Sequence, residues 1–364
     1  MPLSISWGTA VVLVCAAASV GCTSREQVHP TRENLLPDAQ VTTVIADDVA
    51  STHEQSLLLR RLKTAVPMHT VTHVGLEKPV PFGVVTSVAP ISTGYLVFDS
   101  QKRGLHAFDA DGRPHLSTSL GTRETAGRPR AFAVLQNGTI VIGGDRVLRS
   151  FAVDGAAFKE LPSTPIERDV EELCVVGKSL FVRASAVGDS PLIGEYVNGR
   201  PTGVAFGPQY ASKNEEIRTS LSHGHFACLP DAQVIVDGFN LVLPYLVGYS
   251  PSGKRLWTTR IENYKPARIL EYTVDGEARV EHSQRGVHDI LVTIAPLEPE
   301  HVLVQFARRT PNNKVPVIRS YILDAKTGRG SFASDTLPWV KAASATRLFT
   351  IDGVSFNKLN VFAW

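Results

Sequence analysis

Acidic and basic side chains gather near the ends of several strand-like runs. Asp99, Asp237 and Asp352 each end such a run, and Asp145 directly follows another. Carboxylates around a common axis can bind calcium, whereas guanidinium groups bind carboxylates or phosphates, and Asp at such places also stabilises turns. Because both charge types are present, we predict a site for a polar or anionic ligand, with calcium as the alternative. The predicted site consists of Asp99, Arg103, Asp145, Arg146, Asp237, Arg308, Arg309 and Asp352.

A pair of histidines offers a second kind of chemistry. His223 and His225 are separated by one glycine, a spacing at which two imidazoles on a strand can share a metal ion. His282 and His288 follow later in the chain, but no H-E-x-x-H or C-x-x-C motif accompanies them. We therefore favour loop or surface histidines over a metal site, with His223 and His225 kept as weak metal candidates.

Two cysteines remain once the N-terminal region is set aside. Cys174 and Cys228 occupy the same place in their repeat units, three residues before a turn, where other units carry Ile91, Leu135 or Leu297. Equivalent side chains on neighbouring units are expected to point the same way round and not towards each other. The sequence thus favours two buried thiols over a disulfide.

Composition excludes several classes of function. The 364 residues carry 37 basic and 35 acidic side chains, so a strongly basic nucleic-acid binder is not expected. Aromatic residues follow apolar strand positions and do not alternate with a basic stripe, which favours a role in the core over base stacking. The chain has no G-x-S-x-G nucleophile motif and no glycine-rich phosphate-binding motif.

A repeated unit positions these residues. An aromatic or apolar strand followed by a polar turn with glycine recurs at Gly112, Gly155, Gly199, Gly253 and Gly328, with gaps of 43, 44, 54 and 75 residues. Each copy is preceded by a second hairpin, as at Asn137-Gly138, so that one unit contains four short strands. A period of about 40–50 residues is typical of the blades of an all-β propeller.

Five complete units are followed by an incomplete sixth. Its strands are expected at 342–345, 347–351 and 358–364, and its outer strand at Thr70–Leu76, near the start of the domain. Closing the ring in this way removes an exposed sheet edge. Residues 69–364 resemble the six-bladed β-propellers, nearest to the NHL-like and TolB-like groups that include many exported bacterial lipoproteins. The glycine-rich signature of strict NHL repeats is mostly absent, so the resemblance implies a fold and no particular ligand.

Two long connections widen the gaps between units. Residues 208–222 join the third and fourth units, and an extra hairpin at 269–274 and 277–282 lies between the fourth and fifth. Both run from the outer strand of one unit to the inner strand of the next, which places them on one face of the ring. Long loops on a rigid scaffold are where binding usually occurs.

The N-terminus indicates export. Residues 1–21 form an uncharged segment with one short apolar run, which predicts a signal peptide rather than a membrane span. Ser19–Cys22 resembles the lipobox of bacterial lipoproteins, although Ser19 and the absence of Lys or Arg before it depart from the pattern. The resemblance implies lipidation of Cys22 and anchoring to the outer membrane or cell surface. The alternative is ordinary cleavage, which leaves a secreted or periplasmic protein.

A tether is expected between the signal and the propeller. It covers residues 22–68 and includes an amphipathic helix within 51–63, which we expect to pack against its own domain rather than on a membrane.

Three functions remain open. We favour a binding module that recognises an envelope protein or a small polar ligand. A metal-dependent enzyme of the lactonase or lyase type on the same fold is the first alternative, supported by fold analogy alone. A structural scaffold of an envelope complex is the second alternative.

Overall fold

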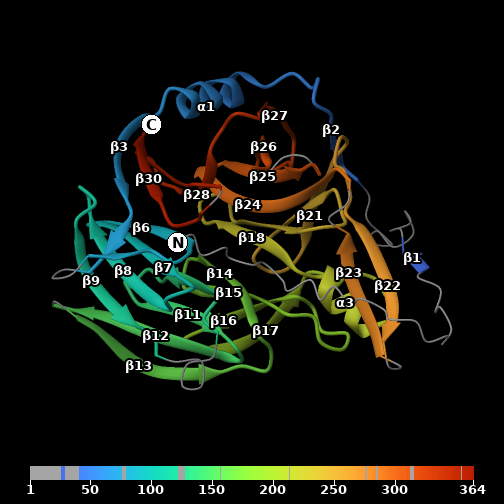
Figure 1. Ribbon diagram of the computed structural model, residues 1–364. Coiled ribbons are helices and arrows are strands. Elements are labelled where there is room, and N and C mark those ends of the chain that lie inside the picture. The colour runs from blue at the N-terminus through green and yellow to red at the C-terminus, as the bar shows by residue number, and fades with distance from the viewer. Residues whose placement is uncertain are drawn as a thin grey trace, which may run out of the picture.

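The computed structural model describes residues 26–28, 41–75, 79–121, 128–155, 157–212, 214–274, 277–283, 286–311, 315–353 and 355–364. These residues form six small antiparallel sheets arranged as blades around a central axis (Figure 1). The strands of each blade are lettered A to D from the axis outwards. The inner strands of neighbouring blades contact one another around the whole ring. The chain is therefore a six-bladed β-propeller, as the repeats predict.

The first three blades follow the repeat closely. Blade 1 comprises β6 (Val85–Ile91), β7 (Gly94–Asp99), β8 (Gly104–Asp109) and β9 (Pro114–Ser119). Blade 2 comprises β10 (Ala131–Val134), β11 (Ile140–Gly144), β12 (Val147–Asp154) and β13 (Ala157–Pro165). Blade 3 comprises β14 (Val170–Val176), β15 (Ser179–Ala184), β16 (Ile193–Val197) and β17 (Arg200–Phe206).

The last three blades carry the additions. Blade 4 comprises β18 (Gly224–Leu229), β19 (Val234–Phe239), β20 (Tyr245–Tyr249) and β21 (Arg255–Ile261). Blade 5 comprises β24 (His288–Glu298), β25 (His301–Arg309), β26 (Val317–Asp324) and β27 (Gly330–Ser334). Blade 6 comprises β28 (Trp339–Ala343), β29 (Arg347–Ile351), β30 (Leu359–Ala363) and β3 (Val66–Val71).

The B strands explain why the repeats fold as blades. In β7, all six residues from Gly94 to Asp99 are buried, because a central strand packs against the next blade on each of its faces. Gly138 has a φ of 80° in the turn between β10 and β11, a conformation that tight hairpin turns need and glycine adopts without strain.

The N-terminal part of the chain closes the ring, as predicted, but with a different strand. The outer strand of blade 6 is β3, which pairs antiparallel with β30, so the predicted span Thr70–Leu76 is placed too late. His73 and Val74 form β4 (His73–Val74), which pairs with β5 (Val80–Pro81) instead. The inner strand β28 also begins earlier than the predicted residue 342. Both differences arise because the apolar alternation continues across the real strand boundaries.

Two faces of the ring differ in their connections. The D-to-A and B-to-C connections lie on one face, which we call the long-loop face, and the A-to-B and C-to-D turns lie on the other, which we call the hairpin face. The predicted extra hairpin is confirmed as β22 (Arg268–Val274) and β23 (Glu277–Ser283). The connection from blade 3 to blade 4 contains a short helix that the sequence reasoning missed, α3 (Glu215–Leu221), whose first turn is capped by Asn214.

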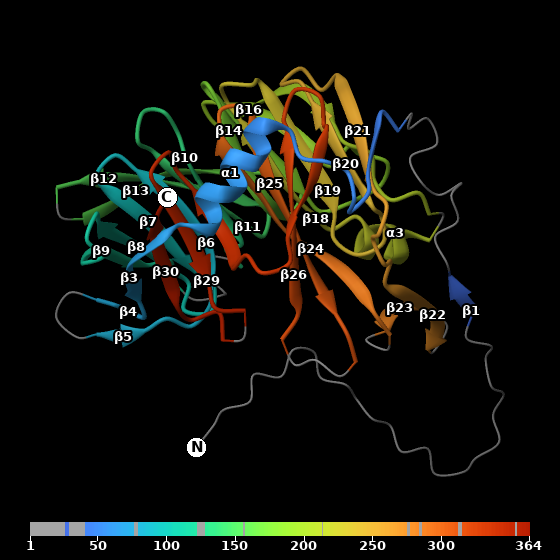
Figure 2. The same cartoon turned by 90° about the horizontal axis from the view of Figure 1, so that it is seen from above.

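Much of the segment predicted as a tether is folded onto the propeller. The strand β2 (Thr43–Ile45) adds to blade 4 as a fifth strand, parallel to β21, and β1 (Glu26–Val28) pairs with β22. The predicted helix is α1 (His53–Lys63), which lies beside blades 5 and 6 (Figure 2). Its Leu58 and Leu62 are buried against these two blades. The helix packs against its own domain, as expected. The predicted boundary between residues 68 and 69 falls within β3.

Candidate functional site on the long-loop face

Most of the predicted ligand-binding acids take part in turns of the long-loop face. The Asp99 side chain is buried, and its carboxylate accepts hydrogen bonds from the backbone N–H groups of Gly83 at 2.6 Å, Val84 at 3.1 Å and Lys102 at 3.0 Å. In the same way Asp145 accepts from the backbone of Arg128 at 3.1 Å. These bonds tie the B-to-C turn to the start of the same blade.

Asp352, Arg103 and Arg146 also lie at turns, whereas Arg308 and Arg309 end strand β25. Arg103 and Arg146 adopt φ values of 50° and 55° in the B-to-C turns of blades 1 and 2. Arg308 donates to both carboxylate oxygens of Asp289 at 2.7 Å, while Arg309 is exposed. Asp352 accepts a hydrogen bond from Ser355 at 2.7 Å. The eight predicted residues are thus distributed around the ring, and ligand binding by them stays a prediction.

The predicted histidine pair meets two acids from the neighbouring blade. His223 Nδ1 lies 2.5 Å from Glu171 Oε1, and His225 Nδ1 contacts Glu172 Oε1. The second oxygen of Glu172 accepts from the backbone N–H of Phe226 at 2.6 Å. The histidines at the start of the inner strand of blade 4 therefore bind carboxylates at the start of the inner strand of blade 3. Among the described residues, no group of three or more His, Cys, Asp or Glu side chains is arranged to hold a metal ion.

A fully buried arginine joins these groups into one network. Arg183, at the end of the B strand of blade 3, donates through Nε to Asp237 at 2.9 Å and through a terminal nitrogen to the backbone oxygen of Ser222 at 2.7 Å. Its other terminal nitrogen contacts Glu171. A buried charge is tolerated only when it is paired and hydrogen-bonded, and here every nitrogen of the guanidinium has an acceptor.

The network shifts the titration of its members. Burial alone would raise the pKa of Glu171, but the hydrogen bond from His223 and the charge of Arg183 outweigh burial and lower it. Burial raises the pKa of Asp237 against the opposing charge of Arg183. Glu171, on the inner strand β14, is therefore held in its charged form more firmly than Asp237, on the B strand β19. We name Glu171, Glu172, Arg183, His223 and Asp237 the charged cluster.

Two of the five residues of the charged cluster are among the residues predicted from the sequence. Asp237 and His223 were candidates, but Glu171, Glu172 and Arg183 were not. The sequence does contain a pattern that predicts the cluster: Arg183 is a charged residue in the otherwise apolar run Ser179–Ala184. A buried arginine needs acidic partners, and the Glu171-Glu172 pair at the start of the same unit supplies them.

Further along the inner strands β14 and β18, a covalent bond joins blades 3 and 4. Cys174 and Cys228 form a disulfide with their Cα atoms 5.5 Å apart. The prediction of two free thiols is therefore wrong. Inner strands of adjacent blades converge at the axis, so equivalent side chains come within bridging distance even though the strands belong to different sheets.

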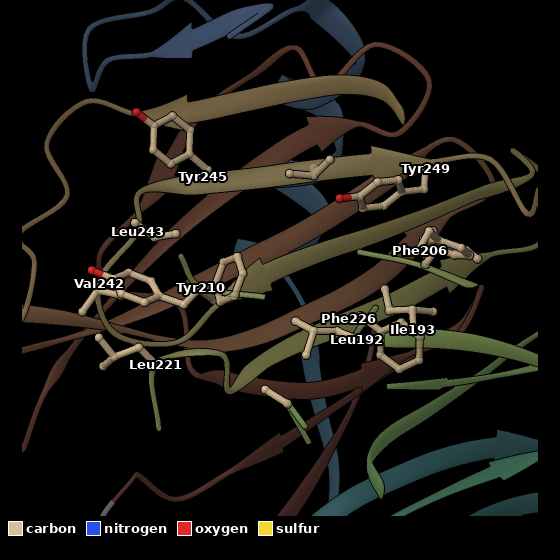
Figure 3. Close-up of a cluster of buried hydrophobic side chains, with 14 of the residues drawn as sticks. Leu192, Ile193, Phe206, Tyr210, Leu221, Phe226, Val242, Leu243, Tyr245 and Tyr249 are labelled. Carbon is tan, nitrogen blue, oxygen red and sulfur yellow. The ribbon is translucent and has the colours of Figure 1, made fainter. Parts of the chain in front are cut away.

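The two long connections meet beside the charged cluster. Helix α3 contacts β23 of the extra hairpin, and both views show the two elements side by side (Figures 1 and 2). Tyr210 and Leu221 of the blade 3 to blade 4 connection pack on Val242 and Leu243 of blade 4, which holds the connection rigidly (Figure 3). A pocket of about 390 Å³ lies between this connection and the B-to-C loop of blade 3, with Arg218 in its wall.

A lysine of blade 6 also lies at the inner edge of the ring. Lys341 of β28 is half-buried, and its Nζ lies 4.8 Å from the ring centroid of Trp339. Burial lowers the pKa of Lys341 to about 8, opposed by the charge of Glu172. Since blades 3 and 6 are opposite one another in a ring of six, positive and negative groups lie on two sides of the axis. Such a site can orient a polar ligand.

Comparison with known proteins supports the propeller fold and assigns no family to the chain. No protein-family model matches the chain, and the search of curated proteins finds no relative. Among solved structures, a member of the DUF4221 family from Bacteroides vulgatus is similar, with a TM-score of 0.54, 9% identity, and 82% of this chain and 97% of that chain covered. A putative exported protein from Bacteroides fragilis is similar with a TM-score of 0.50, 8% identity, and coverage of 88% and 98%. At these identities the likeness shows the propeller fold alone.

The described helices are short. None is long and apolar enough to cross a membrane. The predicted signal peptide and Cys22 lie outside the described residues.

Proposed function

We propose that the protein is an exported binding module of the cell envelope, which recognises another envelope protein with its long-loop face. The observation that carries this proposal is the contact between α3 and β23. Two independent insertions, separated by a whole blade in sequence, extend from the same face and meet there. Loops that a fold does not need for its own closure are commonly retained for binding.

The charged cluster supports the same face. The ion pairs of Arg183 link β15 to Glu171 at the start of β14 and to Asp237 of β19. Arg183 also donates to the backbone oxygen of Ser222, at the end of the connection that carries α3 and directly before β18. A binding surface gains affinity when its loops are already ordered before the partner arrives. The disulfide between Cys174 and Cys228 adds a covalent restraint between β14 and β18.

Export and anchoring form the second part of the proposal. The apolar run before Cys22 and the lipobox-like residues favour a lipoprotein, whose acyl chains would hold the propeller at a membrane. In intact cells, we expect the protein in the membrane fraction with a label from an alkyne fatty acid. Cys22→Ser should lose the label and move to the soluble exported fraction. A labelled or membrane-bound Cys22→Ser protein would contradict lipidation at this residue.

Cross-linking from the two faces tests the binding surface. A photo-reactive phenylalanine analogue at Glu215 or Glu262, both exposed on the long-loop face, should give a discrete adduct of higher mass in cells. The same analogue at Asp111, exposed on the hairpin face, should give none. Adducts from Asp111 alone, or equally from both faces, would refute the proposal. Stoichiometric calcium or zinc in the purified protein, with no adduct from either face, would favour the enzymatic alternative.

A further inference from the structure

A cleft on the hairpin face separates blades 1 and 2. Its volume is about 730 Å³, within the range of sites for small molecules. The floor consists of the apolar side chains of Leu96, Leu116 and Ile140, all of them buried. Its rim is polar and carries no Lys or Arg, and it includes Ser92, Thr93, His115, Gln136 and one acid, Asp109. Val153 of β12 lines the cleft and is 50% exposed.

The other blade junctions show what is missing here. At four C-to-D turns, the outer strand of the preceding blade places a side chain directly against the turn glycine. A Cβ added to Gly253 would lie 2.8 Å from the ring of Phe206, and one added to Gly328 would lie 2.5 Å from the ring of Trp257. His69 covers Gly112 and Thr164 covers Gly199 in the same manner. We call this contact the turn cover.

Blade 2 lacks the turn cover. Within the described part of the chain, no atom lies within 4 Å of a Cβ added to Gly155, the corresponding glycine. Gly155 has the same left-handed backbone as the others, with a φ of 60°, so the turn itself is conserved in shape. What differs is the outer strand of blade 1, which places no side chain over the turn. Val153, two residues before Gly155 in the same turn region, lines the cleft and is exposed.

The chemistry of the missing side chain indicates the occupant. Two of the four turn covers are the aromatic rings of Phe206 and Trp257, which are buried between blades. The one acid of the lining, Asp109, already accepts hydrogen bonds from the backbone N–H groups of Asp111 and Arg113 in its own turn. A cleft with an apolar floor, no cation and this one internally bonded carboxylate favours a neutral ligand, whose ring can pack on the floor beside the exposed Val153. From this geometry we propose that the cleft between blades 1 and 2 binds a small neutral molecule with a flat, apolar ring. This site lies on the opposite face from the proposed partner surface and is independent of it.

Nile red, a neutral aromatic dye, is a suitable probe, because its fluorescence rises in apolar surroundings. With the purified wild-type protein we expect saturable binding at one site. Val153→Phe places a ring in the cleft from the blade 2 wall, and Thr93→Trp does so from the blade 1 wall. Both residues are exposed, so folding should be retained, which the melting curve checks. Each variant should bind the dye at least tenfold more weakly.

Val66→Phe is the matched control. Val66 is also an exposed strand valine, on β3 of blade 6, and its replacement should leave dye binding unchanged. Absence of saturable binding by the wild-type protein would overturn the proposal. Unchanged affinity in both folded cleft variants would overturn it as well, and so would an equal loss in Val66→Phe.

Discussion

The junction between blades 3 and 4 and the junction between blades 1 and 2 are built on the same scaffold but closed differently. At the first, Arg183 is fully buried among acidic partners, a disulfide joins the inner strands, and Phe206 covers the turn at Gly253. Among the residues that the structure describes, the second has none of these features, and it leaves a cleft of about 730 Å³. The blade repeat therefore determines the ring, whereas the side chains between two blades determine whether that junction is closely packed. The two candidate sites of this protein lie at the extensively bonded junction and at the one that leaves a cleft.

Removing the buried guanidinium should produce the largest effect. Arg183→Ala leaves Glu171 and Asp237 buried without their cation, and we expect a loss of about 3–5 kcal/mol in the free energy of unfolding. Urea denaturation measures it. The matched control is Arg309→Ala at the exposed end of a B strand, which should change stability by less than about 0.5 kcal/mol. Equal effects of the two substitutions would show that Arg183 stabilises the blade 3–4 junction no more than an exposed arginine does.

Opening the disulfide should have the next largest effect. Cys174 and Cys228 are 54 residues apart, and a cross-link of that length is expected to stabilise the folded state by about 4 kcal/mol through the unfolded chain. The double substitution to serine should lower the urea midpoint by the corresponding amount. Adding reductant to the wild-type protein should reproduce this decrease and should not alter the double variant. A wild-type protein with two free thiols after denaturation would show that the bond is absent.

The sequence was sufficient to predict the ring and insufficient to predict its junctions. Turn glycines such as Gly112 and Gly253 mark each blade because their positive φ is a local requirement. The pairing of Arg183 with Asp237, or of Cys174 with Cys228, depends on how two sheets approach each other, which no local pattern records. Asp99, a predicted ligand residue, accepts hydrogen bonds from three backbone N–H groups of its own blade, and residue type alone does not distinguish this role from ligand binding.

Buried histidines sharpen the comparison through pH. His106 in blade 1 is buried, and burial lowers its pKa from 6.5 to about 4 against the opposing charge of Asp99. The unfolded chain therefore takes up a proton below about pH 6.5, whereas the folded protein does so only near pH 4. As the pH falls from about 6.5 to about 4, the free energy of unfolding should decrease by about 3 kcal/mol. Above about pH 6.5 this contribution should be constant.

Denaturation curves between pH 4 and pH 8 measure this contribution. His106→Asn, whose amide can keep the hydrogen bond to Ser117, should reduce the pH dependence in this window. His115→Gln, at an exposed position of the same blade, should leave it unchanged. An unaltered pH profile in His106→Asn would mean that this histidine is protonated equally in the folded and unfolded states.

The turn glycines provide the smallest and most specific contrast. Gly155→Ala meets only the strain of a left-handed backbone, about 1–2 kcal/mol. Gly253→Ala adds a clash with Phe206, and overpacking of this kind costs about 1–3 kcal/mol more. The difference between the two variants in urea denaturation should therefore be at least about 1 kcal/mol. If the two substitutions cost the same, then Gly155 is covered in solution and the blade 1–2 junction is not open.

The central claim is that one junction of the ring is open and apolar while its counterpart is sealed. A crystal structure of the protein under xenon pressure tests this most directly, since xenon occupies apolar cavities that lack protein atoms. The account predicts a xenon atom above Leu96 and Ile140 between blades 1 and 2, and none between blades 3 and 4. A blade 1–2 junction filled by rearranged side chains, with no xenon bound there, would contradict it.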